Sequence, residues 1–316
     1  MAKRSPKEAR EFFNEMMSTM ALPVVAAPMF IVSGPKLVRA ECEAGVVGSF
    51  PALNARPAEA LTEWLDEIKE AGRPYAVNHI VHRSNDRLMH DLEVTVKHQV
   101  PIAITSLGAR PEVFEATQSY GGICFHDVIN NTFAKKAVEK GADGLILVAA
   151  GAGGHAGTLS PFALVEEVRE WFEGPILLSG SISTGRGVLA AQAMGADAGY
   201  IGTAFIATDE ANAPDPYKTG IVDGSMEDIV YTNYFSGVHG NYLGPSIAAA
   251  GMDPNNIPEG DLSTMNFKSG GESSVKVWKD IWGAGQGVGS VKSVRPIADY
   301  VDQLAEEYRV AKSGVA

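Results

Sequence analysis

The fold is decided by residues 175–205, PILLSGSISTGRGVLAAQAMGADAGYIGTAF. This stretch contains an apolar run over 175–182, a helical pattern over 185–194 and a second apolar run over 198–205. Each apolar run is nearly continuous, as expected for a strand that is buried on both faces of a parallel sheet. The stretch therefore predicts a strand–helix–strand unit with parallel strands.

The same alternation extends over residues 22–205. The strand candidates are Leu22–Met29, Val46–Pro51, Tyr75–Ile80, Ile102–Gly108, Gly122–Val128, Gly144–Ala149, Pro175–Ile182 and Ala198–Phe205. Helical patterns separate them near 35–44, 57–71, 84–97, 110–120, 131–140, 161–173 and 185–194. Eight such units can form a closed (β/α)8 barrel or a doubly wound open sheet. Because the spacing is regular and no long crossover marks a reversal of strand order, we expect an α/β fold of the (β/α)8 TIM-barrel type.

The character of the sequence changes after the last of these strands. Residues 206–275 contain few strand signals and many Gly, Asn, Pro and Asp residues. We therefore expect an irregular or helical lobe, inserted after the eighth strand and covering the substrate. A helical stretch at about 292–311 would close the outer ring of the barrel. The predicted barrel domain thus comprises residues 1–205 and about 276–316.

The composition excludes several classes of partner. Lys and Arg total 26 against 38 Asp and Glu residues, which gives a net charge of −12 and disfavours binding to phosphate backbones or anionic lipids. The longest apolar run, Leu22–Val32, contains two prolines and is too short to cross a bilayer. The N-terminal segment mixes basic residues with glutamates and indicates an amphipathic surface helix rather than a targeting peptide. We expect neither nucleic acid nor membrane as a partner.

The two cysteines, Cys42 and Cys124, are isolated in apolar surroundings. This predicts buried free thiols and fits a reducing cytoplasm. No cluster of cysteine and histidine has the spacing of a metal site, so no metal is expected. The expected partner is a small-molecule substrate, and the sequence is compatible with a homodimer.

Two neighbouring strand ends carry small residues suited to binding an anion. One strand ends in Ser179-Gly180-Ser181 and the next in Gly202-Thr203. Loops after strands seven and eight form the usual phosphate site of a barrel, and the start of the following helix would add its dipole. The alternative is that these glycines only permit tight turns.

A histidine lies in a glycine-rich loop after another strand, in Ala150-Gly151-Ala152-Gly153-Gly154-His155-Ala156-Gly157. A residue at this place is expected to point into the mouth of the barrel. There the imidazole of His155 can accept or donate a proton near neutral pH. The alternative is a histidine that only forms hydrogen bonds to a loop or a ligand. The loop matches the dinucleotide fingerprint poorly, because the next helix starts only at Ser160-Pro161.

Other strand ends and loops supply weaker candidates. Asn78 could bind a ligand ring or ribityl group, or could simply form a turn. His126 and Asp127 lie at the end of the fifth strand and could contact a ligand or each other. His239, in the expected lobe, could face the barrel mouth. The segment before Gln286 is another loop of small residues, which could pack against a cofactor or break a helix.

In this order, the motifs resemble those of the nitronate monooxygenase family, formerly called 2-nitropropane dioxygenases. The matching segments are Ala26-Ala27-Pro28-Met29, Ala76-Val77-Asn78, Ala152-Gly153-Gly154-His155-Ala156-Gly157, Ser179-Gly180-Ser181 with Gly185-Arg186-Gly187, Gly195-Ala196-Asp197 with Gly202-Thr203, and Gly285-Gln286. The resemblance covers roughly residues 20 to 290. It implies an FMN-binding barrel with a second lobe over the flavin.

The resemblance also implies residue roles. Gly180, Ser181, Gly202 and Thr203 would hold the FMN phosphate, and His155 would be the active-site histidine. The residues expected near the isoalloxazine or elsewhere around the cofactor are Ala27, Pro28, Met29, Asn78, Gly153, Gly154, Ser179 and Gln286.

Two positions depart from the family pattern. Where members often have an acidic residue before the glycine-histidine loop, this chain has Gly151. Where some members have a lysine at the end of the fifth strand, this chain has Asp127. Loss of that cation would stabilise an anionic reduced flavin less.

The leading hypothesis is an FMN-dependent oxidoreductase of the nitronate monooxygenase type, which oxidises alkyl nitronates with O2. One alternative is an NAD(P)H-dependent flavin reductase that acts on a quinone or an enoyl thioester. Another is a non-redox barrel, an isomerase or lyase that binds a phosphorylated ligand. That last class needs paired carboxylates or a strand-end lysine as acid and base, and Asp127 is the only good strand-end carboxylate.

Overall fold

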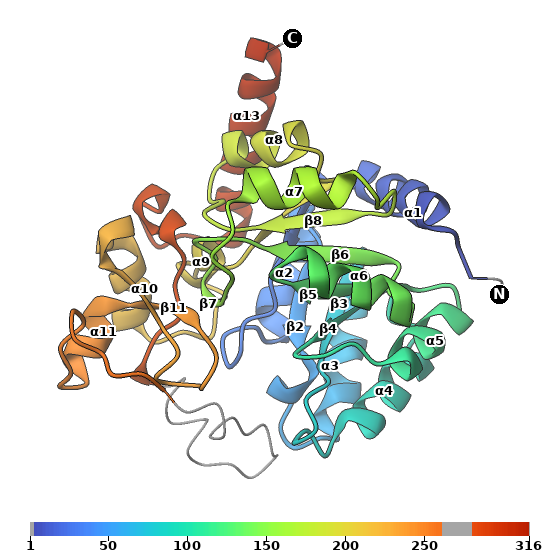
Figure 1. The fold of residues 1–316 in the computed structure, drawn as a ribbon, viewed down its shortest axis with the longest axis horizontal. Coiled ribbons are helices and arrows are strands. Elements are labelled where there is room, and N and C mark those ends of the chain that lie inside the picture. The colour runs from blue at the N-terminus through green and yellow to red at the C-terminus, as the bar shows by residue number, and fades with distance from the viewer. Residues whose placement is uncertain (1–2, 261–279, 316) are drawn as a thin grey trace.

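The computed structural model describes residues 3–260 and 280–315, and at its centre is a barrel of eight parallel strands (Figure 1). The barrel strands are β1 (Val24–Ala26), β2 (Gly48–Pro51), β3 (Tyr75–Ile80), β4 (Ile102–Ser106), β5 (Ile123–Val128), β6 (Gly144–Val148), β8 (Ile176–Ser179) and β9 (Ala198–Ile201). Each strand overlaps one of the eight candidates from the sequence, so the prediction of a (β/α)8 TIM barrel is confirmed.

The barrel closes between its first and second strands. Hydrogen-bonded neighbours follow the order β1-β9-β8-β6-β5-β4-β3-β2, with every pair parallel. A parallel bridge between Val25 and Val47 joins the two ends of this series, and the N–H of Ala26 donates to the carbonyl of Val47 at 2.8 Å. All strands therefore end at one rim, the rim at which barrels assemble their sites.

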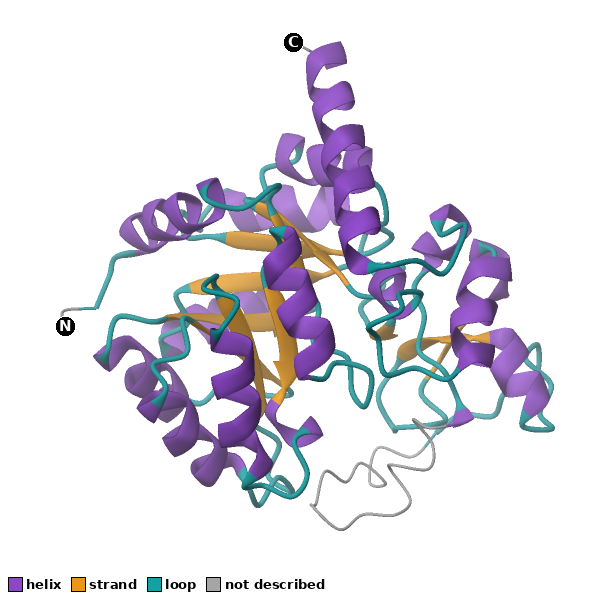
Figure 2. Cartoon of the chain, turned by 180° about the vertical axis from the view of Figure 1, so that it is seen from behind, coloured by secondary structure: helices purple, strands orange, loops and turns teal. Residues whose placement is uncertain are grey.

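Helices form the outer layer of the barrel (Figure 2). They are α2 (Pro35–Ala44), α3 (Ala60–Lys69), α4 (Leu88–Lys97), α5 (Pro111–Ser119), α6 (Asn131–Lys140), α7 (Pro161–Arg169), α8 (Gly185–Ala193) and α13 (Ile297–Val315). Local signals set their ends: at α6, Asn130 accepts a hydrogen bond from the N–H of Phe133, and Gly141 stops the helix with a φ of 114°. Helix α13 packs against α2 and α8 and completes the ring.

The N-terminal helix α1 (Pro6–Ser18) has a structural role that the sequence did not suggest. The expectation of an amphipathic helix holds for its pattern, but its apolar face covers the inner core of the barrel. Phe13 is fully buried and meets Phe125 of β5 edge to face, with ring centroids 5.1 Å apart. The helix therefore closes the end of the barrel opposite the rim on which the strands end.

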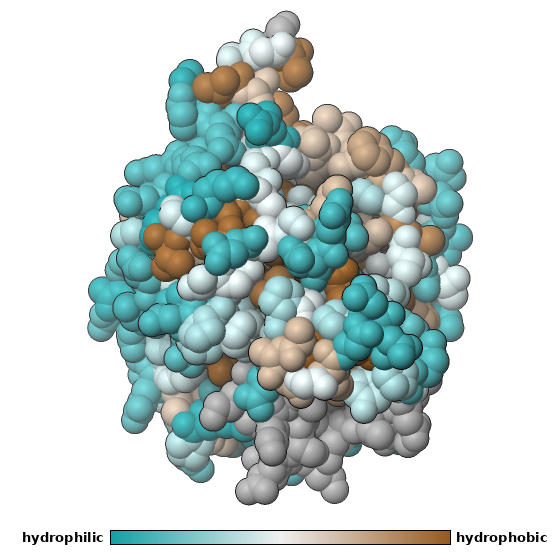
Figure 3. Space-filling view, turned by 90° about the vertical axis from the view of Figure 1, so that its left-hand side faces the viewer, coloured by the Kyte–Doolittle hydropathy of each residue, from teal (hydrophilic) through white to brown (hydrophobic). Residues whose placement is uncertain are grey.

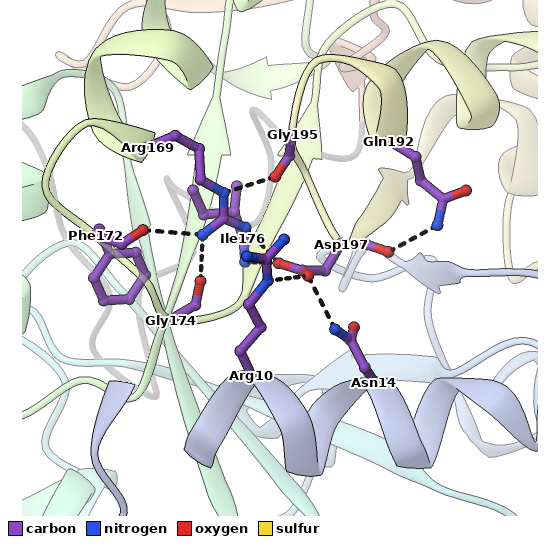
Figure 4. Close-up of polar contacts among 9 residues, drawn as sticks. All are labelled: Arg10, Asn14, Arg169, Phe172, Gly174, Ile176, Gln192, Gly195 and Asp197. Carbon is purple, nitrogen blue, oxygen red and sulfur yellow. Dashed lines mark hydrogen bonds and ion pairs between the residues drawn. The ribbon is translucent and has the colours of Figure 1, made fainter. Parts of the chain in front are cut away.

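A buried carboxylate fastens this helix to the barrel (Figure 4). Asp197, just before β9, accepts hydrogen bonds from Arg10 Nε at 2.7 Å, Arg169 Nη2 at 2.5 Å and the N–H of Ile176 at 2.8 Å. The side chain of Asn14 donates to the same carboxylate. One side chain thus joins α1, α7 and the starts of two neighbouring strands.

The segment after the eighth barrel strand contains a small sheet, contrary to the expectation of an irregular or helical lobe. Strands β10 (Ile229–Thr232) and β11 (Gly240–Leu243) pair with β7 (Gly154–His155) in an antiparallel sheet. The helices of the segment are α9 (Thr203–Ile206), α10 (Asp215–Asp223) and α11 (Gly244–Ala249). The strands are short and their pairing partner is distant in sequence, so no local pattern revealed them. Residues 261–275 of the expected lobe lie outside the described residues.

Several apolar side chains of this segment pack inward, away from solvent. Tyr242, Ile247 and Ile281 form a buried cluster of their own. The outward face on this side of the molecule is mostly polar, with apolar residues in small patches (Figure 3).

The two cysteines are buried free thiols, as expected. Burial raises the pKa of the Cys42 thiol to about 12, so it stays protonated. Within the described residues, no helix combines the length and apolar character that a membrane span requires. Three or more His, Cys, Asp or Glu side chains are nowhere gathered for a metal ion in this described part of the chain.

Replacement of Asp197 by Asn should destabilise the protein by about 3–5 kcal/mol, because it leaves the largely buried Arg169 without its counter-charge. The free energy of unfolding in urea measures this. The matched control is Glu306→Gln, which breaks the exposed Arg309–Glu306 pair and should cost less than about 1 kcal/mol. Equal effects of the two substitutions would contradict a structural role for Asp197.

Replacement of Glu41 by Gln should stabilise the protein at neutral and alkaline pH. Glu41 is fully buried on α2, and burial raises its pKa well above the ordinary 4.5, with Glu210 adding to the rise and the backbone of Ser49 offsetting part of it. Because the folded pKa exceeds the unfolded one, ionisation of Glu41 removes stability as the pH rises above 4.5. Urea unfolding at several pH values should show the gain growing with pH, and a gain that is the same at pH 4 and pH 8 would contradict this role of the buried carboxyl.

Candidate functional site

A cavity of about 860 Å³ opens at the rim where the barrel strands end, between the barrel and the small sheet. This size lies in the range of small-molecule and cofactor sites. Met29 after β1, Asn78 of β3 and Tyr200 of β9 line its barrel side. His155 of β7 and Tyr231 of β10 line the side of the small sheet. The cavity thus lies where two sheets of different origin face each other.

Most residues predicted for the site line this cavity. They are Ala27, Pro28, Met29, Asn78, Gly153, Gly154, His155, Ser179, Gly202 and Thr203. Gly180, Ser181 and Gln286 are not among the lining residues. Ser181 and Gln286 meet at Gly151, where a Cβ would clash with both side chains, and Gly180 lies against the carbonyl of Ala150.

Three loops pack backbone against backbone at one end of the cavity. The N–H of Gly285 donates to Thr203 Oγ1 at 2.9 Å, and the N–H of Gln286 donates to the carbonyl of Gly151 at 2.9 Å. A Cβ on Gly153 would lie 2.8 Å from the nitrogen of Gly285. These glycines therefore permit a close approach of loops that a larger residue would separate.

Two N–H groups at the start of α8 already have partners within the protein. The N–H of Gly185 donates to Glu307 Oε2 of α13 at 2.9 Å, and the N–H of Gly187 donates to the N-cap Thr184. A carboxylate of the protein itself thus occupies this helix end. Any anion near Gly180 and Ser181 would be held by the backbone of the loop.

His155 is held by the small sheet rather than by its own loop. Residues Gly154 and His155 pair with Asn241 and Gly240 of β11, and a Cβ on Gly240 would lie 2.7 Å from the carbonyl oxygen of Gly154. The imidazole Nε2 lies 2.8 Å from Ser236 Oγ. Burial lowers the pKa of His155 to about 4, so its ring is neutral at physiological pH. Sequence reasoning missed Ser236, because this contact spans 81 positions.

The opposite wall carries a chain of hydrogen bonds across three strand ends. Asn78 of β3 donates through Nδ2 to Ser106 Oγ of β4 at 2.7 Å, and Ser106 donates to Asp127 Oδ2 of β5. His126 turns to Thr105, with Nδ1 2.7 Å from Thr105 Oγ1. Burial raises the pKa of Asp127, an effect that His126 and Ser106 partly offset. Ser106 was not identified from the sequence, although it lies within the predicted strand Ile102–Gly108 and ends β4.

Aromatic and basic side chains surround the outer part of the cavity. His239 lines it and stacks on Tyr231, with ring centroids 5.0 Å apart. Phe133, Lys136 and Lys140 line it from α6. The spacing of these three residues places them on one helix face, which is the signal that could have identified them.

The fold and the site define a (β/α)8-barrel protein with a ligand cavity at its C-terminal rim and a neutral histidine facing that cavity. A family model described as nitronate monooxygenase matches residues 49–307. The chain belongs to the nitronate monooxygenase family, a family of oxidoreductases.

Individual relatives are distant. A nitronate monooxygenase from Paraburkholderia phytofirmans is 26% identical, with 91% of this chain and 92% of that protein covered. A (3aS,4S,5R,7aS)-5-hydroxy-7a-methyl-1-oxo-octahydro-1H-indene-4-carboxyl-CoA dehydrogenase from Rhodococcus jostii is 26% identical. That match covers 68% of this chain and 61% of the relative, so the chain spans about three fifths of that protein's length.

Solved structures share the fold. A nitroalkane oxidase from Streptomyces ansochromogenes superposes with a TM-score of 0.84 at 24% identity, with 96% of this chain and all of that chain covered. FabK from Thermotoga maritima superposes with a TM-score of 0.77 at 21% identity, with 96% and 97% covered.

The neutral state of His155 predicts its titration. In spectra of protein labelled with 13C at histidine, the His155 resonance should titrate with a midpoint of about 4, because burial disfavours the charged ring. Since this folded pKa lies below the ordinary 6.5, protonation of His155 should cost stability as the pH falls from 6.5 towards 4. The spectrum of His155→Gln assigns the resonance, and a midpoint near 6.5 would contradict the buried setting.

Proposed function

We propose that the protein is an FMN-dependent oxidoreductase of the nitronate monooxygenase type, which oxidises alkyl nitronates with O2. The observation that carries the proposal is the cavity, which joins glycine-containing backbone loops at one end to a neutral histidine on the facing wall. Backbone N–H groups of such loops suit a phosphate, and a neutral imidazole suits proton chemistry.

The residues present fit FMN. The close approaches at Gly151, Gly153 and Gly180 pack the loops against one another, whereas at Gly154, which lines the cavity, no protein atom lies within 4 Å of the place that a Cβ would take. Gly180 has a φ of 133° and Ser181 a φ of 58°, so the loop turns sharply where a phosphate would be held. Ala27 and Met29 supply an apolar surface for a flat ring. When bound, FMN would supply the electron transfer between the substrate and O2.

His155 is the group that handles the proton in this proposal. Its low pKa means that it cannot offer a full positive charge to an anionic nitronate at neutral pH. It can instead donate a hydrogen bond from a ring N–H, or accept the α-proton of a neutral nitroalkane. The contact between His155 Nε2 and Ser236 Oγ keeps the ring turned toward the small sheet.

The small sheet also shields the site from water in this proposal. Tyr231 donates from its hydroxyl to the carbonyl of Ala156 at 3.0 Å, and Asn241 donates to the carbonyl of Ala152. These bonds hold the histidine loop against the segment after β9. The proposal divides the chain into a barrel of residues 1–205 and about 276–316 and a covering lobe of about 206–275.

The second candidate is a flavin reductase that uses NAD(P)H to reduce a quinone or an enoyl thioester. Lys136 and Lys140 at the cavity mouth, beside Phe133, suit a large substrate with an apolar body and an anionic end.

Anaerobic addition of NADPH or NADH to the FMN-loaded protein separates the candidates. Rapid bleaching of the flavin absorbance would support the reductase, and bleaching only by an alkyl nitronate would support the oxidase.

Replacement of Gly153 by Ala should weaken FMN binding. The added methyl would lie 2.8 Å from the nitrogen of Gly285 and 3.0 Å from Thr203 Oγ1, and overpacking of this kind costs about 1–3 kcal/mol. If the loops must close on the ligand, the dissociation constant for FMN should rise about 10–100-fold, as measured by quenching of flavin fluorescence. The control is Gly289→Ala, where no atom lies within 4 Å and binding should be unchanged.

Replacement of His155 by Ala should leave FMN bound and reduce turnover of a nitroalkane about 10²–10⁴-fold, the range for loss of a general base. The flavin spectrum of the purified variant reports binding, and stopped-flow absorbance reports turnover. Unchanged turnover would remove His155 from the mechanism.

A further inference from the structure

Asp127 is the one acidic side chain among the described residues that line the cavity. It is the last residue but one of β5, on the barrel side of the cavity that His155 lines from the small sheet. Among the described residues, no Lys or Arg forms an ion pair with it. The Lys140 ammonium, which lines the same cavity, donates instead to the carbonyl of Ala109. A carboxyl in this position faces the ligand without a cation to balance its charge.

The hydrogen bonds around Asp127 have a fixed direction. The carbonyl of Ile104 can only accept, so the atom of Asn78 that contacts it must be the Nδ2 donor. The same Nδ2 then donates to Ser106 Oγ, which leaves the Ser106 proton for Asp127 Oδ2. Asp127 therefore receives a hydrogen bond that favours its ionised form.

The described neighbours of Asp127 offset only part of the rise that burial causes in its pKa, and none of them forms an ion pair with it. The His126 ring is turned to Thr105, and burial lowers the pKa of His126, so it is neutral at physiological pH. Burial and the nearby Asp127 raise the pKa of Tyr200 on β9 well above its ordinary value, so this phenol stays protonated. Among the described lining residues on the barrel side, Asp127 is thus the group that can place a negative charge in the cavity.

We propose that Asp127 is an electrostatic determinant of the redox site, whose carboxylate opposes negative charge on the ring of a bound flavin. The proposal rests on the proposed function, because it requires FMN in the cavity. The substrate supplies two electrons to the flavin. When the flavin ring takes up these two electrons and only one proton, it gains one negative charge. A carboxylate beside that ring disfavours the charged product and lowers the midpoint potential of the flavin.

The experiment compares the FMN-loaded wild type with Asp127→Asn, which keeps the shape and removes the charge. The midpoint potential is measured anaerobically against reference dyes. It should be more positive in Asp127→Asn. Sulfite provides a second readout, because its sulfur adds to N5 of the oxidised flavin and leaves the ring anionic. Its dissociation constant should fall about tenfold or more in the variant, as for removal of a nearby like charge.

Three further variants test the assignment. Asp127→Glu keeps the charge and should restore a potential near that of the wild type. Ser106→Ala removes the donor to Asp127 and should shift the potential in the same direction as Asp127→Asn, but less. If Asp127→Asn fails to fold, Ser106→Ala still tests whether the charge of Asp127 affects the potential. Lys97→Gln removes an exposed charge from the last turn of α4, outside the cavity lining, and should leave the potential nearly unchanged.

The outcomes separate the two proposals. A wild type that binds no FMN would overturn the proposed function and this inference together. FMN-loaded Asp127→Asn with the wild-type potential and sulfite affinity would overturn only the role of Asp127. A shift in Lys97→Gln as large in size as that in Asp127→Asn would show that net charge, rather than this carboxylate, sets the potential.

Discussion

The common direction of the eight barrel strands is the constraint on which the site depends. Because every pair is parallel, residues far apart in the chain, such as Met29, Asn78 and Thr203, meet at one rim. The other end of the barrel then needs a separate closure. Helix α1 supplies it, and the Asp197 carboxylate holds that helix to two strand starts. The Asp197 contacts that hold α1 and the cavity therefore lie at opposite ends of the barrel.

The small sheet is the second feature on which the site depends, because it positions His155 at the cavity. Pairing of β7 with β11 fixes its backbone, and the close approach at Gly240 allows the two strands to meet. The segment that contains Tyr231, Ser236 and His239 thus completes the cavity wall.

Burial gives the two sides of the cavity different chemical characters. On the small-sheet side, loss of solvation keeps the His155 imidazole neutral, which suits proton transfer. On the barrel side, the same loss of solvation raises the pKa of Asp127, while the hydrogen bond from Ser106 favours its charge. A ring bound between them would meet a proton acceptor on one side and a carboxyl on the other.

The sequence by itself determined the barrel. Its eight apolar runs, separated by helical patterns, carry the information locally, because burial on both faces and the 3.6-residue helix period act on neighbouring residues. It also indicated the glycine loops and His155, which are marked by local composition. Only the tertiary structure decided the antiparallel sheet β10-β11-β7, the contact of His155 with Ser236, and the occupation of the α8 start by Glu307. Each of these contacts joins residues that are distant in the chain. Such pairings depend on the packing of the whole fold, so no local sequence pattern predicts them.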